Sequence, residues 1–136
     1  MEALVSARLL LQDTNRAEGI WKTARKSRPR DERFLRRLFF LYHDLHRSNE
    51  AAKVARPLLE VNPFDYEVHG RYAHVLVKLD RISKAIEQAE IAVQLNPSSY
   101  EIYEWLSQGY IATGDKEKSD KNREICESLR VDATRE

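Results

Sequence analysis

Apolar residues recur along the chain at the spacing of one helical face. In residues 31–45 they stand at i, i+3, i+4 and i+7, which places them in one stripe along an α-helix. Similar stripes follow in residues 65–78 and 99–112. The pattern predicts three amphipathic helices, whose apolar stripes contain Leu35, Leu38, Phe39 and Tyr42, then Tyr72, Ala73 and Leu76, then Tyr103, Leu106 and Tyr110.

Each amphipathic segment is followed by a short polar break, at residues 46–49, 79–81 and 113–115. A second helix is then expected, with small residues on its inner face. Alanine at such positions lets two antiparallel helix axes approach closely, because no bulky side chain separates them. The alanines are Ala51 and Ala55 after the first break, and Ala85, Ala89 and Ala92 after the second.

Three of the four prolines stand at one fixed interval. Pro29, Pro63 and Pro97 are separated by 34 residues each, and the last two follow an asparagine. An Asn-Pro pair ends one helix and starts another, because proline lacks a backbone donor and pushes the preceding residue out of the helical region. A 34-residue period indicates a repeat protein. A plain helical bundle, the alternative architecture, has no reason to keep such a period.

In these features the chain resembles the tetratricopeptide repeat family. The resemblance rests on the aromatic and leucine-rich stripe of each first helix, the small residues of each second helix and the terminal proline. It implies an all-α fold, an α-solenoid of antiparallel helix pairs wound as a right-handed superhelix. The repeats are then 32–65, 66–99 and 100–133, preceded by a partial repeat at 1–31, in a single domain over residues 1–136.

Departures from the family pattern concern the packing of the helix pairs. The glycine that the family places at repeat position 8 is Phe39, Ala73 or Ser107 in this chain, so the first full repeat is expected to pack less closely. The Gly-Asp turn between the helices is intact only at residues 114–115. Pro57 falls inside a predicted second helix and is expected to kink it, because it removes one backbone hydrogen bond.

Charge is distributed unevenly, although the net charge of the whole chain is only +1. Residues 16–37 contain nine Lys or Arg and three Asp or Glu, a net charge of +6, whereas eleven acids and six bases from residue 85 onward give −5. The small overall charge argues against a general nucleic-acid or membrane-surface binder. Phosphate contact by residues 22–37 is a weaker alternative, because the nearby Trp21 and Phe34 are better explained as core residues than as base-stacking groups.

Nothing in the sequence indicates an enzyme, a cofactor or a metal site. No phosphate-binding glycine loop, nucleophile elbow or metalloprotease helix is present. The single cysteine, Cys126, is expected to be a buried small hydrophobe, and His69 is expected to be a packing residue. His43 and His46 are three residues apart, whereas paired metal ligands on a helix usually stand at i and i+4.

The sequence also carries no signal for a membrane or for secretion. No apolar run approaches the roughly 18 residues that a membrane-spanning helix needs, and the first residues lack the basic region of a secretory signal. A single cysteine forms no intrachain disulfide. These features predict a cytoplasmic protein without a membrane-inserted segment, although a piece of a longer secreted or membrane-attached protein would show the same features.

The family resemblance also implies a binding surface. In tetratricopeptide proteins the first helix of each repeat lines a concave groove with positions 2, 5, 9 and 12, which share one helical face. Position 6 borders that face, and Gly70, at position 5, is expected to open the floor of the groove. The candidate partner-binding residues are Arg33, Arg36, Arg37, Phe40, His43, Arg71, His74 and Trp105.

Arginine presents a rigid planar fork that suits carboxylates, so the expected ligand is a protein or peptide with an acidic segment. In the alternative interpretation these arginines pair with Glu67, Glu101 and Glu104 across neighbouring helices. Such surface ion pairs are worth about 0–1 kcal/mol.

The function predicted from these features is a protein–protein interaction module, or scaffold. A second hypothesis makes the chain a structural element that self-associates through an apolar N-terminal edge formed by Leu4, Leu9, Leu10 and Leu11. A third makes it the regulatory appendage of a larger enzyme or assembly. The polar last helix, residues 117–130, is expected to cap its own end of the array.

Overall fold

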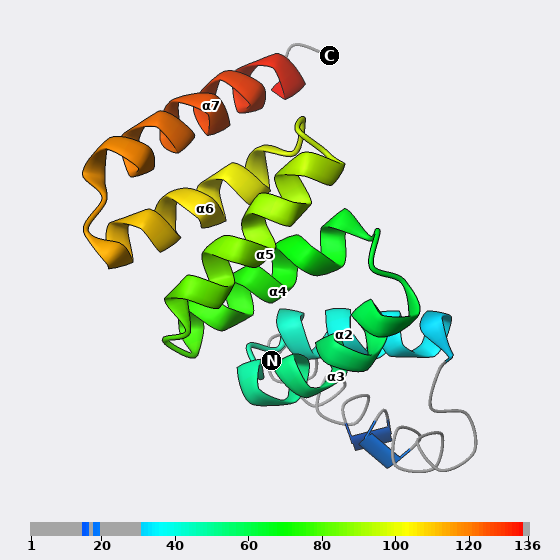
Figure 1. Cartoon of the computed structure of the whole chain (residues 1–136). Coiled ribbons are helices and arrows are strands. Elements are labelled where there is room, and N and C mark those ends of the chain that lie inside the picture. The colour runs from blue at the N-terminus through cyan, green and yellow to red at the C-terminus, as the bar shows by residue number, and fades with distance from the viewer. Residues whose placement is uncertain (1–14, 17, 20–30, 135–136) are drawn as a thin grey trace, which may run out of the picture. The chain divides into compact units, whose positions relative to one another are not determined.

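The computed structural model describes residues 15, 16, 18, 19 and 31–134. These residues form helices and no strands (Figure 1). The elements are α2 (Glu32–Asp44), α3 (Ser48–Val61), α4 (Tyr66–Lys78), α5 (Ile82–Leu95), α6 (Tyr100–Thr113) and α7 (Lys116–Thr134). The three amphipathic helices predicted from the sequence are thus confirmed as α2, α4 and α6. Apart from residues 15, 16, 18, 19 and 31, the predicted partial repeat lies outside the described residues, as does the apolar edge at Leu4 and Leu9–Leu11.

The chain divides into two compact units, Met1–Val61 and Asn62–Glu136. In the first unit α2 packs against α3 as a helical hairpin. The stripe predicted for α2 is buried, with each of its four side chains 2% exposed or less. Burying a side chain of this size contributes about 1.5–3 kcal/mol, so this stripe holds the pair together. The buried residues of α3 are Ala51, Val54, Ala55 and Leu58. The helix continues through Pro57 to Val61.

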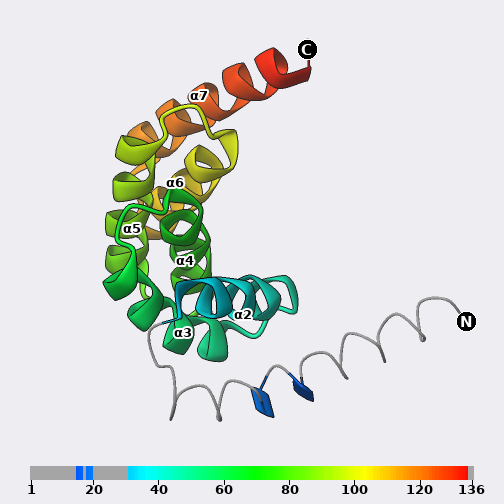
Figure 2. The ribbon, with the colours of Figure 1, turned by 90° about the vertical axis from the view of Figure 1, so that its right-hand side faces the viewer.

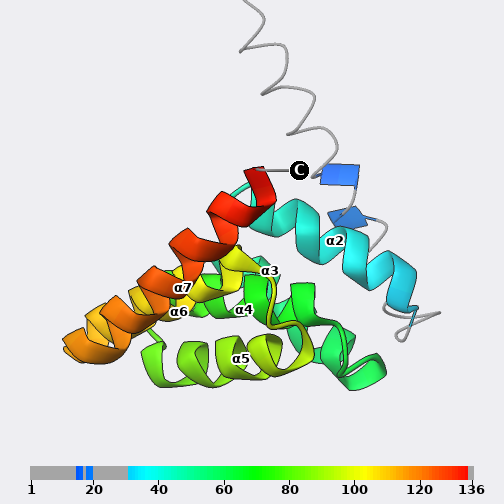
Figure 3. The ribbon, with the colours of Figure 1, turned by 90° about the horizontal axis from the view of Figure 1, so that it is seen from above.

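In the second unit α4 packs against both α5 and α6, α5 also packs against α6, and α6 packs against α7. Figure 2 shows α4 and α6 as neighbours with α5 to one side, and Figure 3 shows α7 alongside α6. Two helix pairs therefore stack so that their first helices are adjacent. The alanines of α5 that were predicted to permit close approach, Ala85, Ala89 and Ala92, are all buried.

Small residues of α6 lie in close contact with the neighbouring helices α5 and α7. A Cβ added at Gly109 would lie 3.0 Å from Cγ1 of Ile86 on α5, a distance that requires a neighbour to shift. Towards α7, the Ser107 hydroxyl donates to the Ser119 carbonyl at 3.0 Å and lies 3.0 Å from the Ser119 hydroxyl. Both serines are buried. Ser107 therefore keeps a close helix contact although it replaces the family's glycine.

The last helix exposes most of its surface. Only Ser119 and Cys126 are buried among the nineteen residues of α7. The capping role expected of this polar helix stays a prediction.

The Asn-Pro pairs end one helix before the next begins, as predicted. Asn62 Oδ1 accepts the backbone N–H of Phe64 at 3.1 Å, and Asn96 Oδ1 accepts that of Ser98 at the same distance. An asparagine side chain that bonds the backbone two residues later closes a turn in place of helical backbone. The 34-residue period therefore specifies a repeated local geometry.

The carbonyls of the same two prolines are held by side chains six residues later. His69 Nε2 lies 2.7 Å from the Pro63 carbonyl oxygen, and the Tyr103 hydroxyl donates to the Pro97 carbonyl at 3.0 Å. His69 Nδ1 also lies 2.6 Å from Oε1 of Gln88, and the histidine is buried. The prediction that His69 is a packing residue is confirmed.

The backbone conformation after each first helix repeats with the same 34-residue period. His46, Asp80 and Gly114 have φ values of 59°, 60° and 80°, in the left-handed region that residues with a side chain disfavour. Each donates its N–H to the carbonyl three residues earlier at 3.1 Å, and the next residue donates to the carbonyl five earlier at 2.8–2.9 Å. These two bonds form a Schellman motif, which ends the helix.

Two buried tyrosines have strongly shifted pKa values. Burial, reinforced by a 2.6 Å hydrogen bond to Glu90, raises the pKa of Tyr110 to about 12. Burial and the negative charge of Glu18 raise the pKa of Tyr42 to about 12. Both phenols are therefore held in the neutral form by the fold.

Glycine at a left-handed position should stabilise the protein. Asp80→Gly is expected to raise the free energy of unfolding by about 0.5–1 kcal/mol, because the cost of a side chain at positive φ exceeds the entropy that glycine adds to the unfolded chain. Gly114→Ala is expected to lower it by about 1 kcal/mol. Urea denaturation followed by circular dichroism measures both changes. Lys84→Gly, at an exposed position inside α5, is the control and should cost about 1 kcal/mol; an equal loss with Asp80→Gly would contradict the account.

Stability should fall as the pH rises from about 10 to about 12. A pKa raised by folding means that the stabilisation is complete below the unfolded value of 10.0 and is lost as the pH rises through the folded value. Each phenol is expected to contribute about 1–3 kcal/mol. Urea denaturation at pH 9 and at pH 11.5 measures the loss. The double variant Tyr42→Phe and Tyr110→Phe should lose much less over this interval, and an undiminished loss would exclude these two groups as its cause.

Candidate functional site

Three of the four arginines predicted to bind a partner lie on α2, outside its buried stripe. Arg33 and Arg37 are exposed, whereas Arg36 is half-buried. The guanidinium carbon of Arg36 lies 4.3 Å from the centroid of the Phe40 ring, within the range of a cation–π interaction. These three arginines and Phe40 are called the α2 patch below.

His43 is more enclosed than the α2 patch. Its ring stacks on Phe39, with the centroids 6.4 Å apart and the planes inclined by 16°. Its Nδ1 lies 3.9 Å from Oδ1 of Asp44, and 13% of its side-chain surface is exposed. Packing against the core thus fixes the imidazole, and its contact with a partner stays a prediction.

Trp105, His74 and Gly70 come together in the second unit. The Trp105 indole stacks on the His74 imidazole, with the centroids 5.3 Å apart and the planes inclined by 13°. A Cβ added at Gly70 would lie 3.0 Å from Cζ3 of Trp105 and 3.1 Å from Cγ1 of Ile102. The expectation that Gly70 opens the floor of a groove is therefore wrong, because Trp105 and Ile102 of α6 fill the space above it. The glycine permits close contact between α4 and α6.

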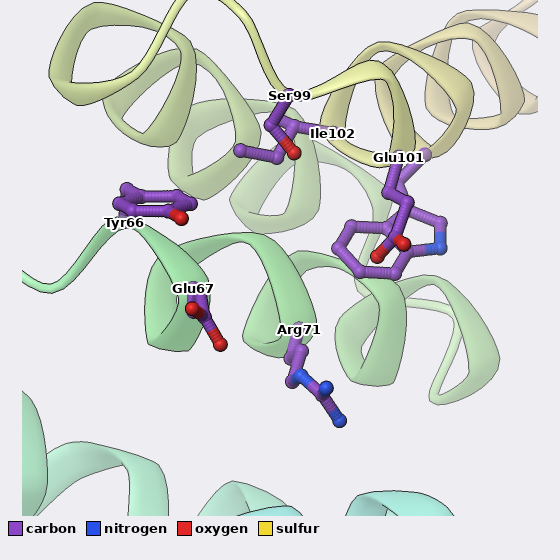
Figure 4. Close-up of a pocket in the computed structure, with 7 residues that line it drawn as sticks. Tyr66, Glu67, Arg71, Ser99, Glu101 and Ile102 are labelled. Carbon is purple, nitrogen blue, oxygen red and sulfur yellow. The ribbon is translucent and has the colours of Figure 1, made fainter. Parts of the chain in front are cut away.

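Beside Trp105, a hollow of about 250 Å³ lies at the first turns of α4 and α6 (Figure 4). It is called the α4–α6 hollow below. Two of the predicted site residues, Arg71 and Trp105, line this hollow together. Tyr66 and Ser99 also line it, and the sequence analysis did not identify them as site residues. The lining residues are Tyr66, Glu67, Arg71, Ser99, Glu101, Ile102 and Trp105.

In the alternative interpretation the candidate arginines pair with acids of neighbouring helices. One of those acids, Glu104, has a different partner. Oε2 of Glu104 lies 3.4 Å from Nη2 of Arg130 on α7. The Arg130 guanidinium carbon also lies 5.4 Å from the centroid of the Tyr100 ring. Glu104 thus takes part in the contact between α6 and α7 rather than pairing with a candidate arginine.

The structure gives the one cysteine a packing role. Cys126 is buried as predicted, and burial raises the pKa of its thiol. An activated thiol needs a lowered pKa and access to solvent, so the observed environment does not suit a nucleophile. In the part of the chain that the structure describes, no group of three or more His, Cys, Asp or Glu residues is placed to hold a metal ion.

None of the helices that the structure describes combines the length and the apolar character needed to cross a bilayer.

Comparison with known proteins identifies the fold. No protein-family model and no curated protein matches the chain. Solved structures of MamA, which have a tetratricopeptide-like helical solenoid, are similar to it. The MamA structure designated MSR-1 gives a TM-score of 0.81 at 20% sequence identity and covers 96% of this chain and 73% of its own.

Two further MamA structures agree with this result. One gives a TM-score of 0.83 at 20% identity, with 92% of this chain and 68% of the other covered. MamA from Desulfovibrio magneticus RS-1, from residue 41 to its end, gives 0.79 at 18% identity, with 90% and 69% covered. Across the similar MamA structures the chain spans 61–73% of their length. The predicted all-α, tetratricopeptide-like solenoid of antiparallel helix pairs is therefore confirmed.

Proposed function

We propose that this chain is a protein–protein interaction module that binds a partner protein on the outward faces of its first helices, which are α2 in the first unit and α4 and α6 in the second. The observation that carries the proposal is the α2 patch, where three arginines lie outside the buried stripe and one of them, Arg36, lies over the Phe40 ring. The tetratricopeptide-like fold supports it, because helix pairing buries one stripe of each first helix and leaves other faces for a ligand.

The chemistry of the α2 patch favours an acidic segment. Arg33 and Arg37 are exposed, and the Phe40 ring beneath Arg36 orders that guanidinium. An arginine binds a carboxylate through two parallel hydrogen bonds. An arginine that is already ordered binds more tightly, because it loses little conformational entropy on binding. An aromatic ring among them offers an apolar surface to a neighbouring side chain. The patch therefore suits a segment in which acidic and apolar residues alternate.

The charge of the first unit adds a long-range attraction. Residues 1–61 contain thirteen Lys or Arg and eight Asp or Glu, a net charge of +5. A field of this sign accelerates the encounter with an acidic partner and weakens as salt increases. The proposal thus predicts capture that is sensitive to ionic strength.

Reversing the charge of the α2 patch should abolish partner capture. The double variant Arg36→Glu and Arg37→Glu is expected to recover at least tenfold less partner from a cell lysate, which corresponds to about 1.4 kcal/mol. Mass spectrometry of the captured proteins measures this loss. Helicity and melting temperature should stay unchanged, since neither side chain is part of the buried stripe.

A matched control places the same charge change on the second helix of the same pair. Lys53 and Arg56 are both exposed on α3, so the double variant Lys53→Glu and Arg56→Glu should keep the partner. An equal loss in this control would mean that net charge, and not the α2 patch, governs binding. Recovery of further copies of the chain as the sole captured protein would favour the self-association hypothesis instead.

A further inference from the structure

The α4–α6 hollow has room for an amino-acid side chain. Its volume of about 250 Å³ is below the roughly 300–1,000 Å³ of sites that enclose a drug-sized ligand. It opens at the first turns of two adjacent helices, between Tyr66 on α4 and Glu101 on α6 (Figure 4). A peptide lying across α4 and α6 can therefore place a single side chain in it.

Negative charge outweighs positive charge in the hollow. Glu67 and Glu101 line it together with Arg71, and Glu101 is exposed. Figure 4 shows the Arg71 side chain extending from α4 away from Tyr66 and Ser99. The second unit as a whole has fourteen acids and ten bases, a net charge of −4. These charges favour a cationic ligand and disfavour a carboxylate.

Two aromatic side chains give the hollow flat walls. Tyr66 and Trp105 both line it and are half-buried. Trp105 is fixed in place because it stacks on His74 and fills the space over Gly70. A fixed ring attracts a cation without the entropy loss of being ordered on binding.

We propose that the α4–α6 hollow binds an arginine side chain of the partner segment. A guanidinium stacks on an aromatic ring with its flat face, and its N–H fork donates two hydrogen bonds to a carboxylate such as that of Glu101. Lysine carries the same charge but has no flat face and no fork. The inference rests on the proposed function, because it names the chemistry of a segment that the interaction module binds.

A titration of the full chain with a blocked Gly-Arg-Gly peptide, followed by nuclear magnetic resonance, tests this inference. The indole N–H signal of Trp105 should shift with a Kd of about 1–10 mM, a range typical of a single side-chain contact. The chain has two tryptophans, so a Trp21→Phe variant identifies that signal. A peptide with citrulline, which keeps the shape and removes the charge, should bind at least tenfold more weakly, and one with lysine about threefold more weakly.

Two glutamates of α6 provide matched variants. Glu101→Gln should weaken binding of the arginine peptide at least tenfold. Glu104→Gln should leave the Kd within about twofold, because Glu104 pairs with Arg130 and does not line the hollow. The inference is overturned if Trp105 does not respond, if citrulline or lysine binds as well as arginine, or if both variants lose binding equally.

The outcomes separate this inference from the proposed function. If the α2 variants lose the partner while the arginine peptide does not bind, the inference fails and the proposed function stands. If the peptide binds but capture does not depend on the α2 patch, the proposed function fails while the hollow keeps its specificity for arginine.

Discussion

The sharp reversal of the backbone after each first helix determines most of what the molecule can do. At His46, Asp80 and Gly114 one residue takes the left-handed conformation, and the Schellman bonds around it turn the chain back on itself. The second helix then begins within a few residues and packs against the first, which buries one stripe of each. The remaining faces of α2, α4 and α6 carry the candidate binding residues, so the turn that pairs the helices also decides where a ligand can bind.

The sequence predicts the helices well, because apolar spacing and Asn-Pro pairs act locally, and it predicts the turns and the site less completely. The left-handed residues His46 and Asp80 were not expected, since the family's glycine is absent there and the conformation is imposed by the helices on either side.

The contact of Trp105 with Gly70 joins residues on two helices and depends on their packing, which is why the expectation of an open floor failed. Tyr66 was not singled out because it stands one residue before the groove positions, although Tyr100 repeats it 34 residues later. By contrast, the contact of Arg36 with Phe40, at i and i+4 on one helix, follows directly from spacing.

Opposite charges in the two units give the chain two different binding chemistries. A net charge of +1 conceals a first unit of +5 and a second unit of −4. We propose accordingly that the α2 patch binds carboxylates and that the α4–α6 hollow binds a guanidinium. A ligand whose charge matches one of these surfaces would be repelled by the other. Charge thus contributes specificity in addition to attraction.

The claim that the first helices bind the partner is tested most directly by hydrogen exchange of the chain alone and in complex with its captured partner. Exchange reports local opening, and a bound segment slows it where the segment lies. We expect slower exchange in α2, α4 and α6, with little change in α3 and α5. Slower exchange in α3 and α5, with the first helices unchanged, would contradict it.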